Sequence, residues 1–177
     1  MTIDEAQREL RRAYVGGGPG AFTSGLIWAG AAFVGQSQSV AQTFAVLFFG
    51  GTLIFPISTL ICRVIFRRPK ESAQNSLGMT ALESTIAMIG GFFAAWLLLP
   101  FKPELVLPLA AIAVGTHYFA FKTVYGDPLY WALAALLTAV GFVQIYLNAL
   151  PGGVMPAVAV IELLFGAFLI ARNLRSA

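Results

Sequence analysis

Six long apolar segments, separated by short connections, dominate this chain. They cover residues 20–35, 40–66, 79–99, 105–121, 129–147 and 154–171. A helix needs about 20 mostly apolar residues to cross a bilayer. In lipid only helices and closed barrels satisfy their backbone hydrogen bonds, and these segments do not alternate polar and apolar residues as barrel strands do. The sequence therefore predicts an all-α, polytopic transmembrane helix bundle.

The composition supports a membrane location. Hydrophobic residues make up 58% of the 177 and charged residues 11%, with a mean hydropathy of +0.80. Soluble domains carry about 25% charged residues. The net charge of +3 does not indicate a nucleic-acid partner, because the basic residues flank apolar segments as topology anchors do. We expect the lipid bilayer to be the main partner.

Six spans would form three hairpins and place both termini on one side. Ten of the 11 basic residues fall on that side: Arg8, Arg11, Arg12, Arg63, Arg67, Arg68, Lys70, Lys122, Arg172 and Arg175. Only Lys102 falls on the other side. Because basic residues concentrate in cytoplasmic loops, we expect the N- and C-termini to be cytoplasmic, in a multi-pass protein of a bacterial inner membrane.

The first residues form a separate unit. We expect residues 1–15 to form a short amphipathic helix that Thr2 caps and that lies at the membrane surface, because its apolar stripe is thin. The sequence GGGPG at residues 16–20 breaks this helix from the first span. Residues 16–177 are then the six-helix transmembrane domain.

Four ionisable residues lie within the predicted spans: Arg63, Glu83, His117 and Glu162. Such residues are costly in lipid and usually face the protein interior or water, so each is a candidate site. At 1.5 Å per residue, the first three lie roughly 6–8 Å from the cytoplasmic ends of their helices, whereas Glu162 lies about 15 Å deep.

The shallow residues allow two interpretations. Arg63 and Glu83 have similar depths on consecutive helices, which favours a structural ion pair between them. Alternatively, Glu83 lies beside His117 and the two handle protons in a cytoplasmic cavity. A third possibility is a neutral His117 that only hydrogen-bonds a neighbouring helix.

Glu162 also has a structural and a functional interpretation. It either forms a buried hydrogen bond or belongs to a substrate or proton pathway. Gln144 and Asn148, near the outer end of the fifth span, are its nearest polar candidates.

Other features suggest packing rather than chemistry. Phe55 and Pro56 could form a hinge or kink, although close packing explains many Gly and Pro residues in membrane helices. The aromatic residues suit membrane interfaces: Trp28, Trp96, Trp131, Tyr118, Tyr125 and Tyr130. No ligand spacing predicts a metal, and no motif predicts a cofactor or a catalytic nucleophile.

Two segments carry a resemblance to known proteins. The sequences LIFPIS at residues 53–58 and THYFAFKTVYGDPLY at residues 116–130 resemble an uncharacterised family of small bacterial polytopic membrane proteins. The resemblance covers the second to fifth spans. It implies a bacterial membrane context and no assigned activity, and it leaves Glu162 outside the matching segments.

The first functional hypothesis is that the protein binds or moves a small solute, with proton linkage, along a route near Glu162, His117, Glu83 and Gln144. It would act as a homo-oligomer, because six short helices leave little room for an enclosed path. The alternative is a non-transporting scaffold or stress-related partner protein whose buried polar residues are structural. An intramembrane enzyme would need convergent catalytic groups that the sequence does not reveal.

Overall fold

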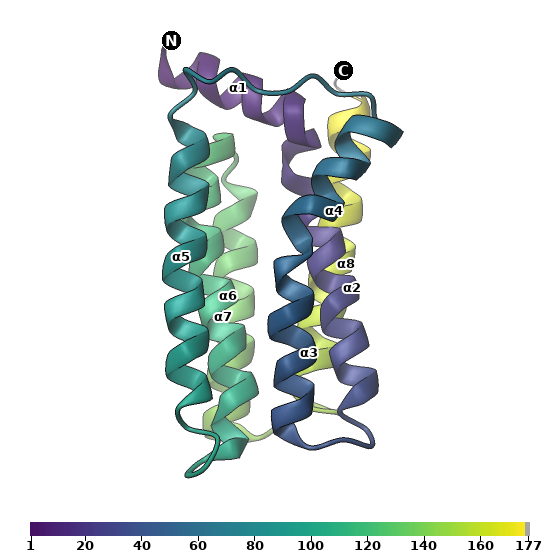
Figure 1. The fold of residues 1–177 in the computed structure, drawn as a ribbon, viewed down its shortest axis with the longest axis vertical. Coiled ribbons are helices and arrows are strands. Elements are labelled where there is room, and N and C mark those ends of the chain that lie inside the picture. The colour runs from purple at the N-terminus through teal and green to yellow at the C-terminus, as the bar shows by residue number, and fades with distance from the viewer. Residues whose placement is uncertain (176–177) are drawn as a thin grey trace.

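The structure, a computed structural model, describes residues 1–175, and all of its regular elements are helices (Figure 1). In chain order these are α1 (Ile3–Tyr14), the 3₁₀ turn η1 (Val15–Gly17), α2 (Gly18–Val34), α3 (Val40–Thr52), α4 (Ile54–Leu60), the π-helical turn η2 (Ile61–Ile65), α5 (Leu77–Trp96), α6 (Pro103–Tyr125), α7 (Leu129–Leu147) and α8 (Val154–Arg175). Each predicted apolar segment is therefore helical, which confirms the all-α prediction.

The long helices identify a membrane protein. Four of those described, α5 to α8, are long and apolar enough to cross a bilayer, and the bent pair formed by α3 with α4 and η2 makes up to five. The remaining predicted span, α2, has 17 residues and is about 26 Å long at 1.5 Å per residue, less than a typical hydrocarbon core of about 30 Å. Length and composition thus support four or five crossings rather than the predicted six.

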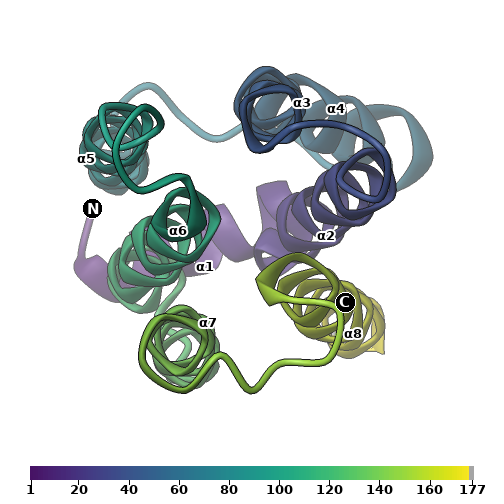
Figure 2. The ribbon, with the colours of Figure 1, turned by 90° about the horizontal axis from the view of Figure 1, so that it is seen from below.

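The two most extensive helix contacts join different predicted hairpins. The most extensive contacts join α2 to α8 and α6 to α7, while α5 packs mainly on α6 (Figure 2). Small residues allow the α2–α8 approach: a Cβ atom added at Gly25 would lie 2.8 Å from the backbone nitrogen of Leu163. Because the hydrophobic effect contributes little to association between helices in lipid, such close backbone contact is a main source of helix association.

A bend divides the second predicted span. α3 and the helix that follows, Ile54–Ile65, meet at an angle of 41°. Pro56 has no backbone N–H, and its ring would clash with the carbonyl of Thr52, four residues earlier, if the helix ran straight. The bend lies beside Phe55 and Pro56, with the break at Leu53; a hinge at these residues stays a prediction.

α1 lies across one end of the bundle, at the same end as the last turn of α8 (Figure 1). Thr2 caps this helix as predicted, in a capping box with Glu5. Gln7 donates a hydrogen bond to the Thr123 carbonyl at 2.8 Å, and Arg11 donates one to the Tyr125 carbonyl. These side chains satisfy carbonyls that the end of α6 leaves without helical partners, so α1 covers the bundle as well as lying at its surface.

Candidate functional site

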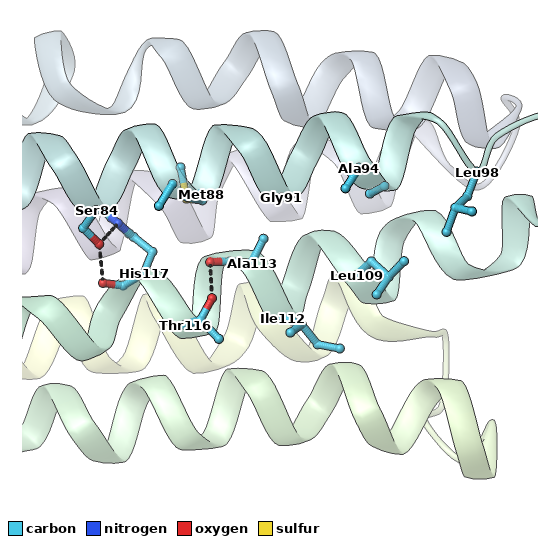
Figure 3. Close-up of a pocket in the computed structure, with 12 residues that line it drawn as sticks. Ser84, Met88, Gly91, Ala94, Leu98, Leu109, Ile112, Ala113, Thr116 and His117 are labelled. Atoms are coloured by element: carbon cyan, nitrogen blue, oxygen red, sulfur yellow. Dashed lines mark hydrogen bonds between the residues drawn. The ribbon is translucent and has the colours of Figure 1, made fainter.

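A groove of about 520 Å³ runs between α5 and α6. Figure 3 shows Ser84 and His117 at one end of this groove and Leu98 and Leu109 at the other. Between these ends the lining is small or apolar: Ala87, Met88, Gly91, Ala94, Ala95, Ile112 and Ala113, with Thr116 near His117. From Ser84 to the end of α5 at Trp96 the helix rises about 18 Å. The groove is therefore long, largely apolar and polar at one end only.

The polar end has a defined hydrogen-bond arrangement. Ser84 Oγ lies 2.8 Å from His117 Nδ1 and 2.9 Å from the backbone oxygen of His117. A hydroxyl has one proton, so both contacts are hydrogen bonds only if Ser84 donates to the carbonyl and Nδ1–H donates to Oγ. Nε2 then carries a lone pair and accepts. The ring nitrogens form no other hydrogen bond within residues 1–175, so Nε2 is available to a donor from a solute.

Glu162 lies in a different environment. Its side chain is fully buried in α8, and the Tyr118 hydroxyl of α6 donates a hydrogen bond to its Oε1 at 2.9 Å. Ser24 of α2 interacts with the same carboxyl group. Within residues 1–175, however, Glu162 Oε2 forms no hydrogen bond of normal distance and angle. The carboxyl group thus joins three helices within the extensive contact between α2 and α8. It does not line the α5–α6 groove.

Tyr118 is one of four aromatic residues whose positions differ from those expected from the sequence. It was expected at an interface with Tyr125, Tyr130 and Trp28, but all four side chains are buried. Tyr118 stacks on Tyr130, which in turn stacks on Tyr125 and donates a hydrogen bond to the Gly16 carbonyl at 2.7 Å. The available signal was the spacing of Tyr118 and Tyr125, seven residues apart on one helical face.

Arg63 does not pair with Glu83. Its guanidinium forms an ion pair with Glu71 at 3.2 Å and donates hydrogen bonds to carbonyls of Ala13, Arg68 and Pro69. Glu83 is exposed on α5, and among residues 1–175 it takes part in no ion pair. The prediction failed because the connection after η2 turns back over Arg63, which brings a nearer carboxylate to it.

Glu71 also accepts a hydrogen bond from Tyr14 of α1 at 2.7 Å. Burial, followed by this contact with Glu71, raises the pKa of the Tyr14 hydroxyl, so Tyr14 remains a donor at neutral pH. Arg63, Glu71 and Tyr14 therefore fix the end of the bent span to α1.

The other predicted pathway residues do not converge. Gln144 donates a hydrogen bond to Asn148, one turn further along, at 2.6 Å, rather than contacting Glu162. Glu83 does not line the groove beside Ser84 and His117. His117 and Glu162 are linked only indirectly, because the rings of His117 and Tyr118 lie 5.6 Å apart. Within residues 1–175, no three His, Cys, Asp or Glu side chains gather as a metal site.

Comparisons with known proteins place the chain in a family without assigning an activity. Searches of curated proteins and of solved structures gave no match. A family model described as a family of unknown function, DUF7010, matches residues 3–172. The match extends beyond the second to fifth spans that carried the resemblance and includes Glu162. The chain therefore belongs to the DUF7010 family, a family of unknown function.

Proposed function

We propose that this membrane protein binds an elongated amphiphilic solute in the α5–α6 groove. The observation that carries the proposal is the groove itself, which has one polar end at Ser84 and His117 and extends about 18 Å along α5 with a mainly apolar lining. Pockets of about 300–1,000 Å³ with few polar groups are typical of small-molecule sites. The unprotonated Nε2 selects a solute whose polar end donates a hydrogen bond, such as a hydroxyl or an amine.

Movement of the solute through a route that includes Glu162 receives less support. Glu162 contacts Tyr118 and Ser24 in the α2–α8 contact, away from the groove. This geometry favours the structural interpretation of Glu162. We therefore assign solute binding to the groove and helix association to Glu162, and we propose no catalytic reaction and no cofactor.

The expected membrane arrangement is part of the proposal. We propose a bacterial inner-membrane location with both termini cytoplasmic, supported by the ten basic residues at the end covered by α1. The sixth crossing would be α2, which packs along α8. Labelling of single cysteines placed at Ser37 and at Lys102 tests this topology, because both should react only from the outer side. Reaction of either from the cytoplasmic side would reject it.

Homo-oligomer formation is proposed through α5. Met79, Leu82, Ile86, Ile89 and Phe93 are exposed on this helix at alternating spacings of three and four residues. This is the seam of a helix that packs on another helix. Disulfide crosslinking through Leu82→Cys in membranes should give dimers; only monomers would contradict the proposed seam.

The binding experiment uses the purified protein in nanodiscs and radiolabelled 1-hexadecanol, a probe with one hydroxyl donor and one apolar chain. His117→Ala should weaken binding by about threefold to tenfold, the usual net value of one hydrogen bond. Ala94→Phe should abolish binding, because Ala94 lines the groove. The matched control is Ala135→Phe on the exposed face of α7.

Two results would reject the groove as the site. Equal losses in Ala94→Phe and Ala135→Phe would show that the bulky ring, rather than its position, is responsible. Equal affinity for hexadecanol in Ala94→Phe and in the unaltered protein would place binding elsewhere. Proteoliposome flux then tests movement: flux that survives Glu162→Gln but not Ala94→Phe supports the groove without a role for Glu162.

A further inference from the structure

A second pocket, of about 330 Å³, lies between α1 and the connection after η2. Its lining consists of Arg8, Glu9, Arg12, Ala13, Pro69 and Lys70. Arg8 and Arg12 are one helical turn apart, so both project from the same face of α1. The pocket is therefore shared between two segments that the chain brings together from far apart in the sequence.

The cations of this pocket differ from three partnered arginines at the same end of the bundle. Arg63 pairs with Glu71, Arg172 pairs with Asp127, and Arg11 hydrogen-bonds the end of α6. Arg8, Arg12 and Lys70 are exposed and form no ion pair or side-chain hydrogen bond within residues 1–175. Arg8 also has an electrostatic contact with Glu5 on the same helix.

The single carboxylate of the pocket is already occupied. Glu9 accepts hydrogen bonds from Asn75 at 2.6 Å and from the Ser72 backbone and hydroxyl at 3.0 and 3.2 Å. These bonds, that from Asn75 first, lower the pKa of Glu9, so it stays ionised at neutral pH. Three cations against one carboxylate leave a net charge of two, which suits a phosphate group.

The depth of the pocket indicates where the phosphate comes from. Arg63, in the last turn of the bent span, donates hydrogen bonds to the carbonyls of Arg68 and Pro69. Pro69 is thereby held at the level where that span ends. The neighbouring Val64 and Ile65 are 63% and 67% exposed, as lipid-facing side chains are. Headgroups of the adjacent leaflet lie at this level, next to apolar surface that acyl chains can cover.

We propose that the pocket binds the phosphate headgroup of an anionic phospholipid from the leaflet at the α1 end. Basic pockets beside the ends of membrane helices suit such headgroups. The bound lipid would contact α1 and residues 69–70 at once, so it would hold α1 against the bundle. This site is separate from the groove between α5 and α6, and either could fail without the other.

The test measures lipid binding to the detergent-purified protein by native mass spectrometry, with phosphatidylglycerol and phosphatidylcholine of identical chains. We expect phosphatidylglycerol to be preferred. Arg8→Gln with Arg12→Gln should weaken its binding by roughly tenfold to thirtyfold. The matched control removes two exposed arginines outside the pocket, Arg67→Gln with Arg175→Gln, and should retain binding. Lys70→Gln gives an independent variant in the second segment.

Specific outcomes would overturn the proposal. Equal loss in the pocket and control variants would show that general positive charge is responsible. Equal binding of the two lipids would remove the role of the anionic headgroup. Inorganic phosphate that binds as tightly as phosphatidylglycerol and competes with it would assign the pocket to a soluble phosphate. Circular dichroism of each variant identifies any loss of helix. If only the control variant loses helix, Lys70→Gln still tests whether the pocket binds the lipid.

Discussion

At the scale of single residues, the contact between Tyr118 and Glu162 ties three helices together without any ion pair. The hydroxyl donates to one carboxyl oxygen at 2.9 Å, and Ser24 interacts with the same carboxyl group from α2. Both side chains are buried among apolar residues. In such surroundings a polar group without a partner costs more free energy than a hydrogen bond contributes. Removing only the tyrosine hydroxyl should therefore destabilise the protein more than removing both the hydroxyl and the carboxyl group.

Tyr118→Phe should therefore lower the free energy of unfolding in detergent by about 1–2 kcal/mol, because it leaves a buried carboxyl oxygen without its donor. Adding Glu162→Leu to Tyr118→Phe should recover much of that loss. Thermal unfolding of the three proteins provides the measurement. The control is Tyr146→Phe, since Tyr146 is 78% exposed and its hydroxyl forms no hydrogen bond within residues 1–175. Equal effects of the two tyrosine substitutions would contradict a stabilising bond.

The sequence predicted the importance of Glu162 but not its partner. A carboxylate in an apolar segment is visible in a single chain, because its cost in lipid does not depend on the fold. Its partner depends on which helix lies beside it, and α6 and α8 are not consecutive. The same reason applies to Arg63: Glu83 is on the next helix, but the path of residues 66–76, which has no periodic pattern, supplies Glu71 instead.

At the scale of helices, glycine determines how closely α2 and α8 approach. A Cβ atom at Gly25 would lie 2.8 Å from the Leu163 backbone nitrogen, a contact that neither helix can relieve by rotating a side chain. Gly30, further along the same helix, has open space on its Cβ side. Substitutions at Gly25 and Gly30 thus distinguish the effect of close helix packing from the general effect of glycine on helix stability.

Gly25→Ala should destabilise the protein by about 1–3 kcal/mol, the typical cost of overpacking. Gly30→Ala should leave stability unchanged or raise it by up to about 1 kcal/mol, since alanine is the better helix former. Thermal unfolding in one detergent measures both. Equal shifts in the same direction would show that the α2–α8 contact does not limit stability at Gly25.

The bent span shows what a helix pattern can and cannot predict. An apolar run with a proline predicts a helix with a bend, and Pro56 does accompany a 41° change of direction. The run cannot predict that the following turn is π-helical at Ile61–Ile65, because neither hydropathy nor helix propensity distinguishes the two hydrogen-bond patterns. It also cannot predict the groove, which depends on residues of α5 and α6 together.

At the scale of the whole molecule, α1 connects parts of the chain that are far apart in the sequence. It contacts the end of α6 through Gln7 and Arg11, and the connection before α5 through Glu9. An amphipathic pattern predicted a surface helix, and that much follows from the sequence. The docking does not, because an apolar stripe suits a membrane surface and a bundle end equally well.

Docking of α1 should weaken in acid. Hydrogen bonds from Asn75 and Ser72 lower the pKa of Glu9 below its ordinary value of 4.5. A carboxyl group whose pKa is lower in the docked state stabilises docking above its ordinary pKa, and that contribution is lost as the pH falls through the lowered value. We therefore expect amide hydrogen exchange of α1, measured from neutral pH downward, to change below about pH 4.5. There it should be faster than the intrinsic pH dependence of amide exchange predicts.

Glu9→Gln should remove most of this dependence on pH and raise exchange at neutral pH. Asp4→Asn changes an exposed carboxylate of the same helix that forms no hydrogen bond or ion pair with residues 72–75, so this variant should behave as the unaltered protein does. Acid sensitivity that persists in Glu9→Gln would assign the effect to another group.

The contact between α2 and α8 also has a consequence for the order of events during synthesis. α2 leaves the ribosome more than a hundred residues before α8, which is on the order of ten seconds at roughly 5–20 residues per second. Throughout that interval its glycine-rich face has no partner from its own chain. Gly18 and Gly25 must therefore meet lipid or an insertion factor first, and the bundle closes only when the last helix displaces that temporary neighbour.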